Sequence, residues 1–411
     1  MTVLSEENDE ISLRPIRAAV AVATHGAICR AASHLHRSAP ATTRAILEIE
    51  AKLGVELFDR SRQGLRVTDD GQIAIRRFQC TLEQLRLAEL EVNAGSMLAH
   101  KVTHRHLRTI VAVMEEGSET AAARRLHVSQ PAVTRTLRDI ENIVGRALFF
   151  RTTRGMIATS PGELLYKRAK LSLAEIRALM EDLANRRGSL VGRVVVGVLP
   201  LCATLLVPRA ITRLLVSYPE VKVRVIEGRY EPLRAALIRG DVDVVVGALR
   251  PFSAELRQEV LFIDNLVVIS RPGHPVLDKP ASLLRNLANA QWVIPAEATP
   301  ARDRFDQMFH DIGLDVPPRA IESGSLATVR ALLLESDRIS VASPHQVYYE
   351  LQHGLLTAHA IELGNTDRHI GFAVRSNFRP THAVERFMEE IRAVSHQLTD
   401  GQPQPNQPRT S

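Results

Sequence analysis

The sequence of 411 residues has little cysteine: three residues, Cys29, Cys80 and Cys202, none of them in a CxxC pair. This scarcity argues against a disulfide framework and against a cysteine-based zinc site, so we predict no metal. The chain also lacks a long apolar run. Its longest apolar stretch, residues 194–207, is interrupted by Pro200 and is too short to cross a bilayer, so we expect no membrane partner.

Signals of secretion and of cofactor chemistry are missing as well. The first ten residues carry four acidic side chains and no basic one, unlike a signal peptide, and we therefore expect a cytoplasmic protein. Val196-Gly197-Val198 lacks the further glycines of a dinucleotide-binding loop, and no phosphate-binding loop is present. We predict no cofactor, no catalytic residues and no enzyme. The alternative, an enzyme of an unrecognised kind, would require that the protein be shown to turn over a metabolite.

Two segments of the first half match each other at a shift of 91 residues. Residues 25–71 align with residues 116–162 without a gap, and about 19 of the 47 pairs are identical. A match of this density indicates that a whole structural unit is duplicated. The net charge of +6 makes an acidic partner plausible, although charge alone says little about function.

The second copy has the pattern of three helices followed by a β-hairpin. Apolar residues recur at helical spacing over 104–115, and Ser118 can cap a second helix over 119–126. Ser129 can cap a third helix to about residue 143, with Pro131 in its first turn. Residues 151–159 then predict a two-stranded wing that turns at Gly155. Two helices joined by a tight turn, followed by a wing, are typical of a winged helix-turn-helix that places a helix in the major groove.

The polar edge of the third helix and the wing supply the candidate DNA contacts. The amide of Gln130 can pair with an adenine edge, and Arg135 and Arg154 suit phosphate or minor-groove contacts. Residues 103–162 contain nine arginines and five acids. The alternative is a three-helix motif that serves protein contacts only. The predicted DNA-binding residues are Ser129, Gln130, Pro131, Thr134, Arg135, Arg138, Arg151 and Arg154.

The segment AAARRLHVSQPAVTR (121–135), with Ile140-Glu141, Gly145, Leu148-Phe149 and Arg151, resembles the signature of LysR-type transcriptional regulators. The resemblance covers about 103–396. It implies a DNA-binding winged helix-turn-helix, a dimerising linker helix and a two-lobed effector domain. We therefore expect an effector-controlled regulator whose partners are double-stranded DNA, a small molecule such as a sugar or organic acid, and further copies of itself as a dimer or tetramer. The alternative is a ligand-binding module that acts through protein contacts.

The first copy departs from this signature. Ala39 stands where the second copy has Gln130, and Leu47 replaces Arg138. Whether this unit contacts DNA stays open, the alternatives being packing on the second unit or non-specific backbone contact. Its candidate contacts are Thr43, Arg44, Arg60 and Arg62.

The helix that follows the second wing has neither proline nor glycine over 163–187. Its apolar residues alternate at spacings of four and three, which predicts a coiled-coil seam and a dimer contact. The alternative is an amphipathic helix packed on its own chain. The stripe consists of Ala169, Leu173, Ile176, Met180 and Leu183.

From residue 192 onward, strands and helices alternate, which predicts a parallel α/β sensor of two lobes similar to periplasmic binding proteins. Effectors of such sheets bind at the carboxyl ends of strands and at helix N-termini, although simple helix capping is the alternative for each residue. Cys202 is more simply a packed residue than an oxidant sensor. The candidate effector contacts are Pro200, Leu201, Cys202, Ala203, Thr204, Gly247, Ala248, Leu249, Ser323, Gly324, Ser325 and Thr328.

The predicted fold class is thus multidomain: two all-α winged helix-turn-helix units with linker helices, then a two-lobed α/β sensor. The predicted segments are a disordered tail (1–11), the first winged unit (12–71), a linker helix (72–100), the second winged unit (103–162), a dimerisation helix (163–188), the effector domain (192–400, with lobe I at 192–268 and 354–400 and lobe II at 269–353) and a disordered tail (401–411).

Overall fold

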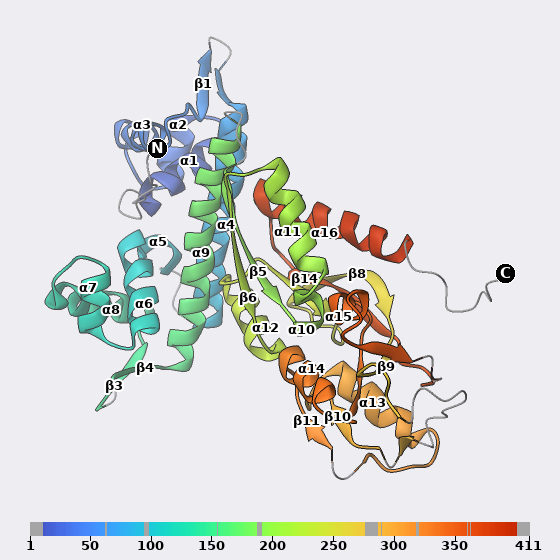
Figure 1. Ribbon diagram of the computed structural model, residues 1–411. Coiled ribbons are helices and arrows are strands. Elements are labelled where there is room, and N and C mark those ends of the chain that lie inside the picture. The colour runs from blue at the N-terminus through green and yellow to red at the C-terminus, as the bar shows by residue number, and fades with distance from the viewer. Residues whose placement is uncertain are drawn as a thin grey trace. The chain divides into compact units, whose positions relative to one another are not determined.

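The computed structural model describes residues 11–61, 64–93, 98–153, 155–186, 191–275, 287–288, 290–317, 320–359, 361 and 363–400. The chain forms two compact units, Met1–Ser189 and Leu190–Ser411. The first is helical with two short hairpins, and the second is α/β, which confirms the predicted fold class (Figure 1). The predicted tails lie outside the described residues except for Ile11, which is buried in the core.

The N-terminal unit contains the same series of elements twice, joined by the short helix α5 (Leu98–Lys101). The first copy comprises α1 (Leu13–His25), α2 (Ile28–His34), α3 (Ala39–Leu53), β1 (Phe58–Ser61), β2 (Gly64–Val67) and α4 (Asp69–Glu91). The second comprises α6 (His104–Glu116), α7 (Glu119–Arg125), α8 (Gln130–Val144), β3 (Phe149–Thr152), β4 (Gly155–Ala158) and α9 (Ser160–Asn185).

The duplication extends to individual hydrogen bonds. Thr68 and Thr159 cap α4 and α9 by accepting from the N–H groups of Gly71 and Gly162. A Cβ atom on either glycine would lie 2.1 Å from a backbone carbonyl oxygen, so the chain approaches itself too closely there for any other residue. Both copies therefore require the same backbone contact where the hairpin meets the long helix.

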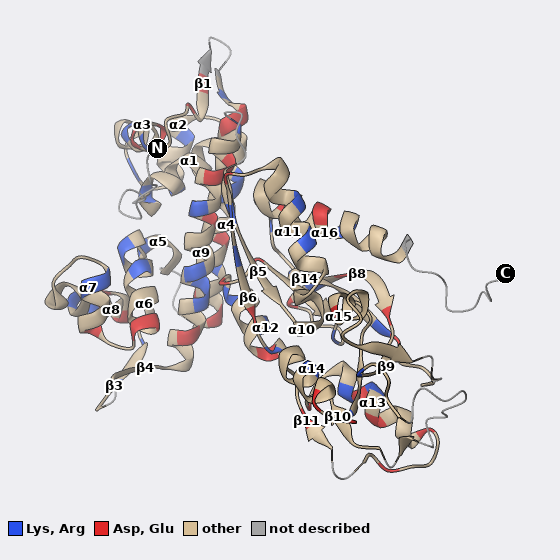
Figure 2. Ribbon diagram, in the orientation of Figure 1, with Lys and Arg blue, Asp and Glu red and all other residues tan. Residues whose placement is uncertain are grey.

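The long helices α4 and α9 pack along each other in antiparallel orientation. Arg77, early in α4 and buried, donates to Glu175 (2.9 Å) and Asp182 (2.8 Å) in the second half of α9. Arg168, early in α9, pairs with Glu91 at the end of α4. Charged segments of both signs recur along these two helices (Figure 2). The two copies are thereby joined by a charged and apolar helix pair within one chain.

This pairing changes the interpretation of α9. The sequence predicts an apolar seam that faces a second copy, but Ala169, Ile176 and Leu183 are buried within this single chain. Both winged units and both long helices share one continuous hydrophobic core from Ile11 to Leu183. The alternative from the sequence, packing on the same chain, is what the contacts show.

The C-terminal unit contains two five-stranded sheets. The first has the order β6-β5-β7-β14-β8 and the second the order β11-β10-β12-β9-β13. The first lobe is built from β5 (Gly192–Val198), α10 (Pro200–Ala203), α11 (Leu206–Ser217), β6 (Val221–Glu227), α12 (Tyr230–Arg239), β7 (Val244–Ala248), β8 (Leu256–Asp264), β14 (Arg368–Arg375) and α16 (His382–Asp400). The second is built from β9 (Val267–Ser270), β10 (Trp292–Ile294), α13 (Pro300–His310), β11 (Ile321–Glu322), α14 (Leu326–Leu334), β12 (Ile339–Ala342), α15 (Tyr348–Gln352) and β13 (Thr357–His359).

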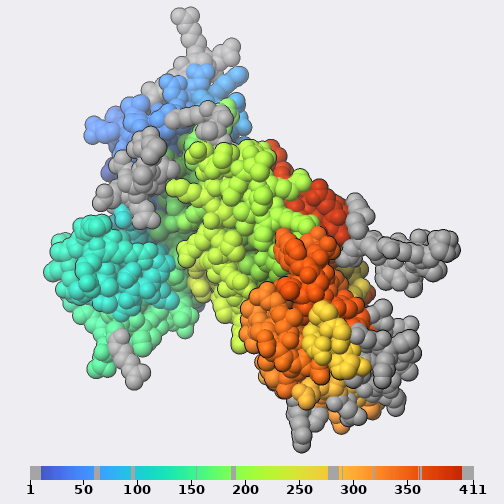
Figure 3. Space-filling view, viewed as in Figure 1, coloured from blue at the N-terminus to red at the C-terminus, as the bar shows by residue number. Residues whose placement is uncertain are grey.

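Each sheet is covered by helices on both faces. One apolar cluster joins the first sheet to α11 and α16, and another joins it to α12. In the second sheet, Trp292 packs edge-on against Phe305 and Phe309 of α13, while α14 and α15 cover the opposite face. In the space-filling view the first lobe is coloured green and red, and the second mainly yellow and orange (Figure 3). Burial on both faces explains why the central strands β5, β7 and β12 are almost continuously apolar.

The chain crosses between the lobes twice, between Asp264 and Val267 and between His359 and Arg368. The predicted boundaries at 268 and 354 were therefore wrong by a few residues, because β9 and β13 pair with each other in the second sheet. Strand length alone could not show which sheet each strand joins. In the part of the chain that the structure describes, no helix is both long and apolar enough to cross a membrane.

Candidate DNA interface and effector site

Helix α8 presents a polar edge to solvent. Val133, Leu137 and Ile140 are buried in the core, which leaves Arg135 and Arg138 exposed on the other side of the helix. Neither arginine has a hydrogen bond or ion pair with any described residue. Two unpaired guanidinium groups on an exposed helix are suitable contacts for phosphate oxygens or base edges.

Ser129 is the N-cap of α8, as predicted, but its side chain makes no capping hydrogen bond. Its counterpart in the first copy, Ser38, accepts from the N–H of Ala41 at 3.4 Å. Ser129 is exposed, and its hydroxyl group is therefore available at the start of α8. An exposed hydroxyl at this position can donate to a phosphate oxygen.

A buried carboxylate ties the start of α8 to the wing. Glu119, the first residue of α7, is only 7% exposed. Its Oε2 accepts from Thr134 Oγ1 (2.6 Å) and from Gln130 Nε2 (3.0 Å). Its Oε1 accepts from Arg151 Nη2 of β3 (2.5 Å). Three predicted DNA contacts thus share one internal partner.

Burial by itself would raise the pKa of Glu119. The hydrogen bonds from Thr134 and Gln130 and the positive charge of Arg151 outweigh burial, so the net pKa is lowered. The carboxylate is therefore ionised at neutral pH and can only accept hydrogen bonds. From the sequence, Glu119 is expected only to begin a helix, and the one signal that sets it apart is that the first copy has Ile28 at that position.

The first copy has no equivalent network among its described residues. Ile28 and Ala39 replace Glu119 and Gln130, and Leu47 puts an apolar side chain, 51% exposed, where α8 has Arg138. Among its candidate contacts, Arg44 is exposed and without a described partner, and Thr43 is half-buried. The side chain of Arg60, and Arg62 and Arg154 entirely, lie outside the described residues.

The wing of the second copy is anchored to the helix-turn-helix and projects from it (Figure 1). The N–H of Met156 donates to the carbonyl of Gly117 (2.8 Å), and a Cβ on Gly155 would lie 2.5 Å from that same oxygen. Phe150 and Ile157 face each other across the hairpin and are 60% and 56% exposed. The predicted turn at Gly155 is thus placed by a backbone contact.

The candidate effector residues of the first lobe follow two neighbouring parallel strands. Residues 200–204 follow the end of β5. Ala248 is the last residue of β7, the hydrogen-bonded neighbour of β5, and Leu249 follows it. Cys202 is fully buried, which raises the pKa of its thiol and supports a packing role. A Cβ on Gly247 would lie 2.5 Å from the side chain of Leu199, so this glycine permits close packing.

The candidate residues of the second lobe cap α14. Ser325 accepts from the N–H of Thr328 (3.4 Å), and Ser323 accepts from the N–H of Ser325 (3.2 Å). Two N–H groups expected to bind a ligand are therefore occupied by side chains of the same turn. Gly324 and Thr328 remain exposed.

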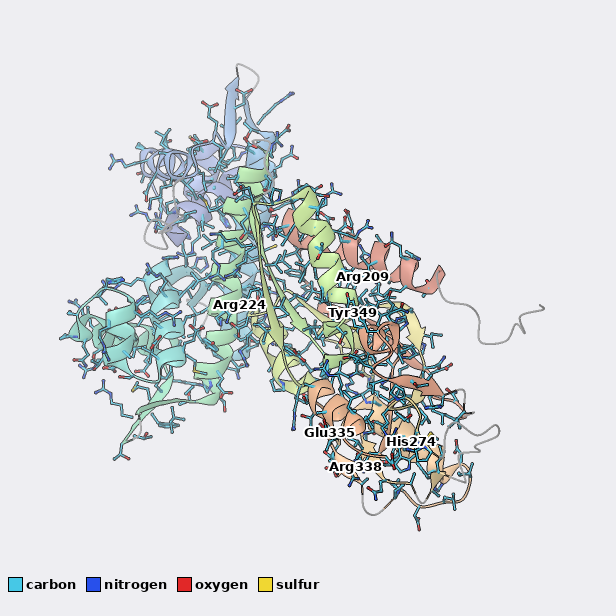
Figure 4. The ribbon with its side chains drawn as sticks, in the orientation of Figure 1. Arg209, Arg224, His274, Glu335, Arg338 and Tyr349 are labelled. Carbon is cyan, nitrogen blue, oxygen red and sulfur yellow. The ribbon has the colours of Figure 1, made fainter. Side chains whose placement is uncertain are left out.

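Arg250, which the sequence analysis does not single out, follows the β7 loop and reaches the second lobe. Its guanidinium lies over the ring of Tyr230 (5.0 Å) and donates to the carbonyl of Ala298 (3.4 Å). Burial lowers the pKa of Arg250, although the group remains a cation. A second contact between the lobes comes from Arg209, which lies over Tyr348 (5.0 Å), next to Tyr349 (Figure 4).

A winged helix-turn-helix carried in one chain with a two-lobed α/β binding domain defines a ligand-responsive transcriptional regulator. Comparison with known families gives the same result. Residues 187–395 match the LysR substrate binding domain, and residues 13–72 and 104–163 each match the bacterial regulatory helix-turn-helix protein of the lysR family. The chain belongs to the LysR family, and its helix-turn-helix is present twice.

The related proteins are also HTH-type transcriptional regulators. The HTH-type transcriptional regulator GalR of Pseudomonas putida is 36% identical over 386 residues, 93% of this chain and 97% of that protein. An alignment of that length must include part of the first winged unit. The regulator PcaQ of Agrobacterium fabrum is 30% identical over 307 residues, 74% of this chain and 99% of that protein.

Among solved structures, a full-length variant of OxyR from Pseudomonas aeruginosa superposes with a TM-score of 0.58 at 25% identity, covering 74% of this chain and 100% of that OxyR chain. The LysR-family regulator CbnR superposes with a TM-score of 0.51 at 20% identity, covering 72% of this chain and 99% of CbnR. The fold is shared over that part of the chain, and the rest of this chain lies outside both superpositions.

Proposed function

We propose that the second winged unit, residues 103–162, is the DNA-reading head of this regulator. The observation that supports this most is the pair of exposed, unpaired arginines on α8, Arg135 and Arg138. They lie on the helix that begins after Ser129, whose hydroxyl makes no capping hydrogen bond. We assign base and phosphate contacts to Ser129, Gln130, Pro131, Thr134, Arg135, Arg138, Arg151 and Arg154.

The test is the affinity of the full-length protein for a duplex selected from a random-sequence pool. Changing Arg135 to Ala should weaken specific binding by about 1–3 kcal/mol, because one direct contact is lost. Fluorescence anisotropy across a salt series would measure this, since phosphate contacts give a steep negative dependence on salt. Unchanged affinity would show that α8 is not the recognition helix.

Two further variants test whether the sensor or the first winged unit also contributes to DNA affinity. Arg224, exposed on β6 of the sensor (Figure 4), lies outside both winged units, so Arg224→Ala should leave affinity unchanged. Arg44 is the repeat counterpart of Arg135. Because α3 lacks the polar edge of α8, Arg44→Ala should weaken binding to every sequence slightly and leave sequence preference intact.

We further infer that the first winged unit, residues 12–71, is mainly a scaffold that supports the second through α4. Arg17 of α1 supports this role. It donates to the carbonyls of Ala99 and Val102 (2.6 and 2.9 Å), which lead into the second copy. Burial, with a smaller effect from the charge of Arg37, lowers the pKa of Arg17 to about 10. We also assign weaker, sequence-independent contacts with the DNA phosphate backbone to Thr43, Arg44, Arg60 and Arg62.

The effector site is proposed at the ends of β5 and β7 and at the N-terminus of α14, within residues 192–400. Pro200, Ala203, Thr204, Ala248 and Leu249 would contact the ligand from one lobe, and Ser323, Gly324, Ser325 and Thr328 from the other. Leu201, Cys202 and Gly247 would shape the site from the core. Arg250 favours an organic acid over a neutral sugar, because a partly buried cation attracts a carboxylate.

A thermal-shift screen of acids, sugars and aromatics in the full-length protein tests the site. An acid that raises the unfolding midpoint should lose most of that shift in Arg250→Gln, whereas a shift that survives would place the ligand elsewhere. We propose that the protein acts in the cytoplasm, and that copies associate through surfaces other than the α9 stripe.

A further inference from the structure

We propose that Glu119 is a specificity-determining residue of the recognition helix. It fixes Gln130 as a hydrogen-bond acceptor toward the base edge and weakens the contact of Arg151 with the phosphate backbone. This inference rests on the proposed function of the second winged unit as the DNA-reading head.

The first step is the orientation of the Gln130 amide. Glu119 is ionised and offers only acceptors, so the nitrogen of the amide must face it. Gln130 Nε2 lies 3.0 Å from Glu119 Oε2 and 3.2 Å from Thr134 Oγ1. The hydroxyl hydrogen of Thr134 is itself donated to Glu119 at 2.6 Å, which leaves the Thr134 oxygen as an acceptor. The amide of Gln130 therefore turns its nitrogen toward Glu119 and Thr134, and its oxygen is the end that is left to face a base.

The second step concerns which bases this oxygen can contact. In the major groove, adenine offers a donor at N6 and cytosine a donor at N4, whereas guanine and thymine offer acceptors at the corresponding edge. The paired contact of a free glutamine with adenine needs one donor and one acceptor from the amide. Held by Glu119, Gln130 can make only the acceptor half. The chain should therefore accept adenine or cytosine at one base position and reject guanine and thymine.

The third step concerns charge. Arg151 Nη2 is bound to Glu119 Oε1 at 2.5 Å, although the side chain of Arg151 is 63% exposed. An arginine held by an internal carboxylate contributes less to sequence-independent attraction than a free one. Glu119 thus lowers non-specific affinity while it sharpens base preference, and both effects increase the specificity ratio.

The first copy shows the same fold without this device. It keeps Thr43 and Arg60 at the positions of Thr134 and Arg151 but has Ile28 and Ala39 in place of Glu119 and Gln130. The helix-turn-helix therefore folds without a carboxylate at this position, so folding alone does not require Glu119. Its role is better explained by what the second copy contacts.

The experiment uses full-length protein and two variants. A random-sequence duplex pool first identifies the preferred site of the wild-type protein, and single-base substitutions of that site are then titrated across a salt series. Glu119→Ile, which installs the residue of the first copy, frees the Gln130 amide to donate, so the rejection of guanine and thymine relative to cytosine should fall about ten-fold at one position, while adenine stays favoured. It should also steepen the slope of log K against log salt by about one, because Arg151 becomes free. Glu119→Gln keeps an amide oxygen for Thr134 and Gln130 but removes the charge, so it should steepen the slope and keep most of the preference.

Glu116→Gln is the matched control. Glu116 is a neighbouring exposed carboxylate that binds Arg125, which lies outside the proposed contacts, so its variant should show wild-type preference and slope. A wild-type preference and slope in Glu119→Ile would overturn the inference while leaving the DNA-reading head intact. Absence of specific binding by the wild-type protein would instead overturn the proposed function. If Glu119→Ile melts early, an unchanged slope in Glu119→Gln overturns the charge argument on its own.

Discussion

His106 forms a capping box at the start of α6 that depends on its protonation state. Its Nδ1 accepts from the N–H of Thr103 (3.2 Å), and its own backbone N–H donates to the Thr103 hydroxyl (3.3 Å). Burial, only partly opposed by Asp139 and reinforced by Arg105, lowers the pKa of His106 below its usual 6.5. A protonated ring cannot accept from the N–H of Thr103, so this half of the capping box exists only with a neutral imidazole.

This cap makes a pH prediction. At pH values between the pKa of His106 in the folded chain and its pKa of 6.5 in the unfolded chain, the unfolded chain binds more protons. The free energy of unfolding therefore falls as the pH drops through 6.5 and levels off below the pKa of the folded state. His106→Gln should preserve the capping box and remove this component, which is worth at most about 1 kcal/mol. Thermal melts of both proteins from about pH 8 to about pH 5.5 would show it. Parallel curves would mean that His106 does not contribute.

At the residue scale, the sequence predicted the exposed residues of α8 correctly, because helical periodicity determines which side of a helix is buried. It could not predict that Glu119 binds Gln130, Thr134 and Arg151. Those contacts depend on how α7, α8 and β3 pack, which no local spacing encodes. The same limit explains Arg250, which contacts Tyr230 of α12 in its own lobe and Ala298 of the second lobe.

At the scale of elements, the α4–α9 pair depends on one buried arginine. Removing the Arg77 guanidinium would leave Glu175 and Asp182 as uncompensated, mostly buried carboxylates. Arg77→Met should destabilise the N-terminal unit by about 3–5 kcal/mol, since breaking a buried ion pair from one side is strongly unfavourable. Chemical denaturation followed by circular dichroism would measure the loss.

A control lies on the same helix. Arg86 pairs with Glu83 on the exposed side of α4, so Arg86→Met should change stability little. The triple variant Arg77→Met, Glu175→Gln, Asp182→Asn should recover part of the loss, because no buried charge remains. Equal effects of Arg77→Met and Arg86→Met would contradict the proposed importance of the buried pair.

The partner of α9 illustrates what the sequence could determine about elements. The spacing of apolar residues predicted a long helix with a buried stripe, and both are present. Periodicity does not identify the covering surface, however, and the duplicated helix α4 covers it within the same chain. Glu89 of α4 stands at the repeat position of Met180 in the α9 stripe, and it accepts from the N–H of Ala99 (2.9 Å) at the connection between the copies. This polar residue thus helps to hold the connection.

At the scale of the molecule, the sensor is held together where the chain passes between its lobes. Asp264 at the end of β8 and Arg368 at the start of β14 form an ion pair and are 2% and 6% exposed. The same carboxylate accepts from Ser343, which follows β12 of the other sheet. One buried charge pair therefore connects both crossing strands with the second lobe, although its two members are 104 residues apart in the sequence.

Because of this connection, we expect that one substitution can reduce the effector response without changing DNA binding. Arg368→Met leaves Asp264 buried without its cation, which should destabilise the sensor by about 3–5 kcal/mol, and Asp264→Asn in the same chain should restore part of it. DNA affinity without effector should stay at the wild-type value, because the reading head lies in the other unit. The effector-dependent change in affinity should shrink, since a ligand shifts an equilibrium only by its differential affinity for two defined lobe arrangements. Anisotropy titrations with and without an effector found in the thermal-shift screen would test this, and a full effector response in Arg368→Met would show that signalling does not depend on the buried pair.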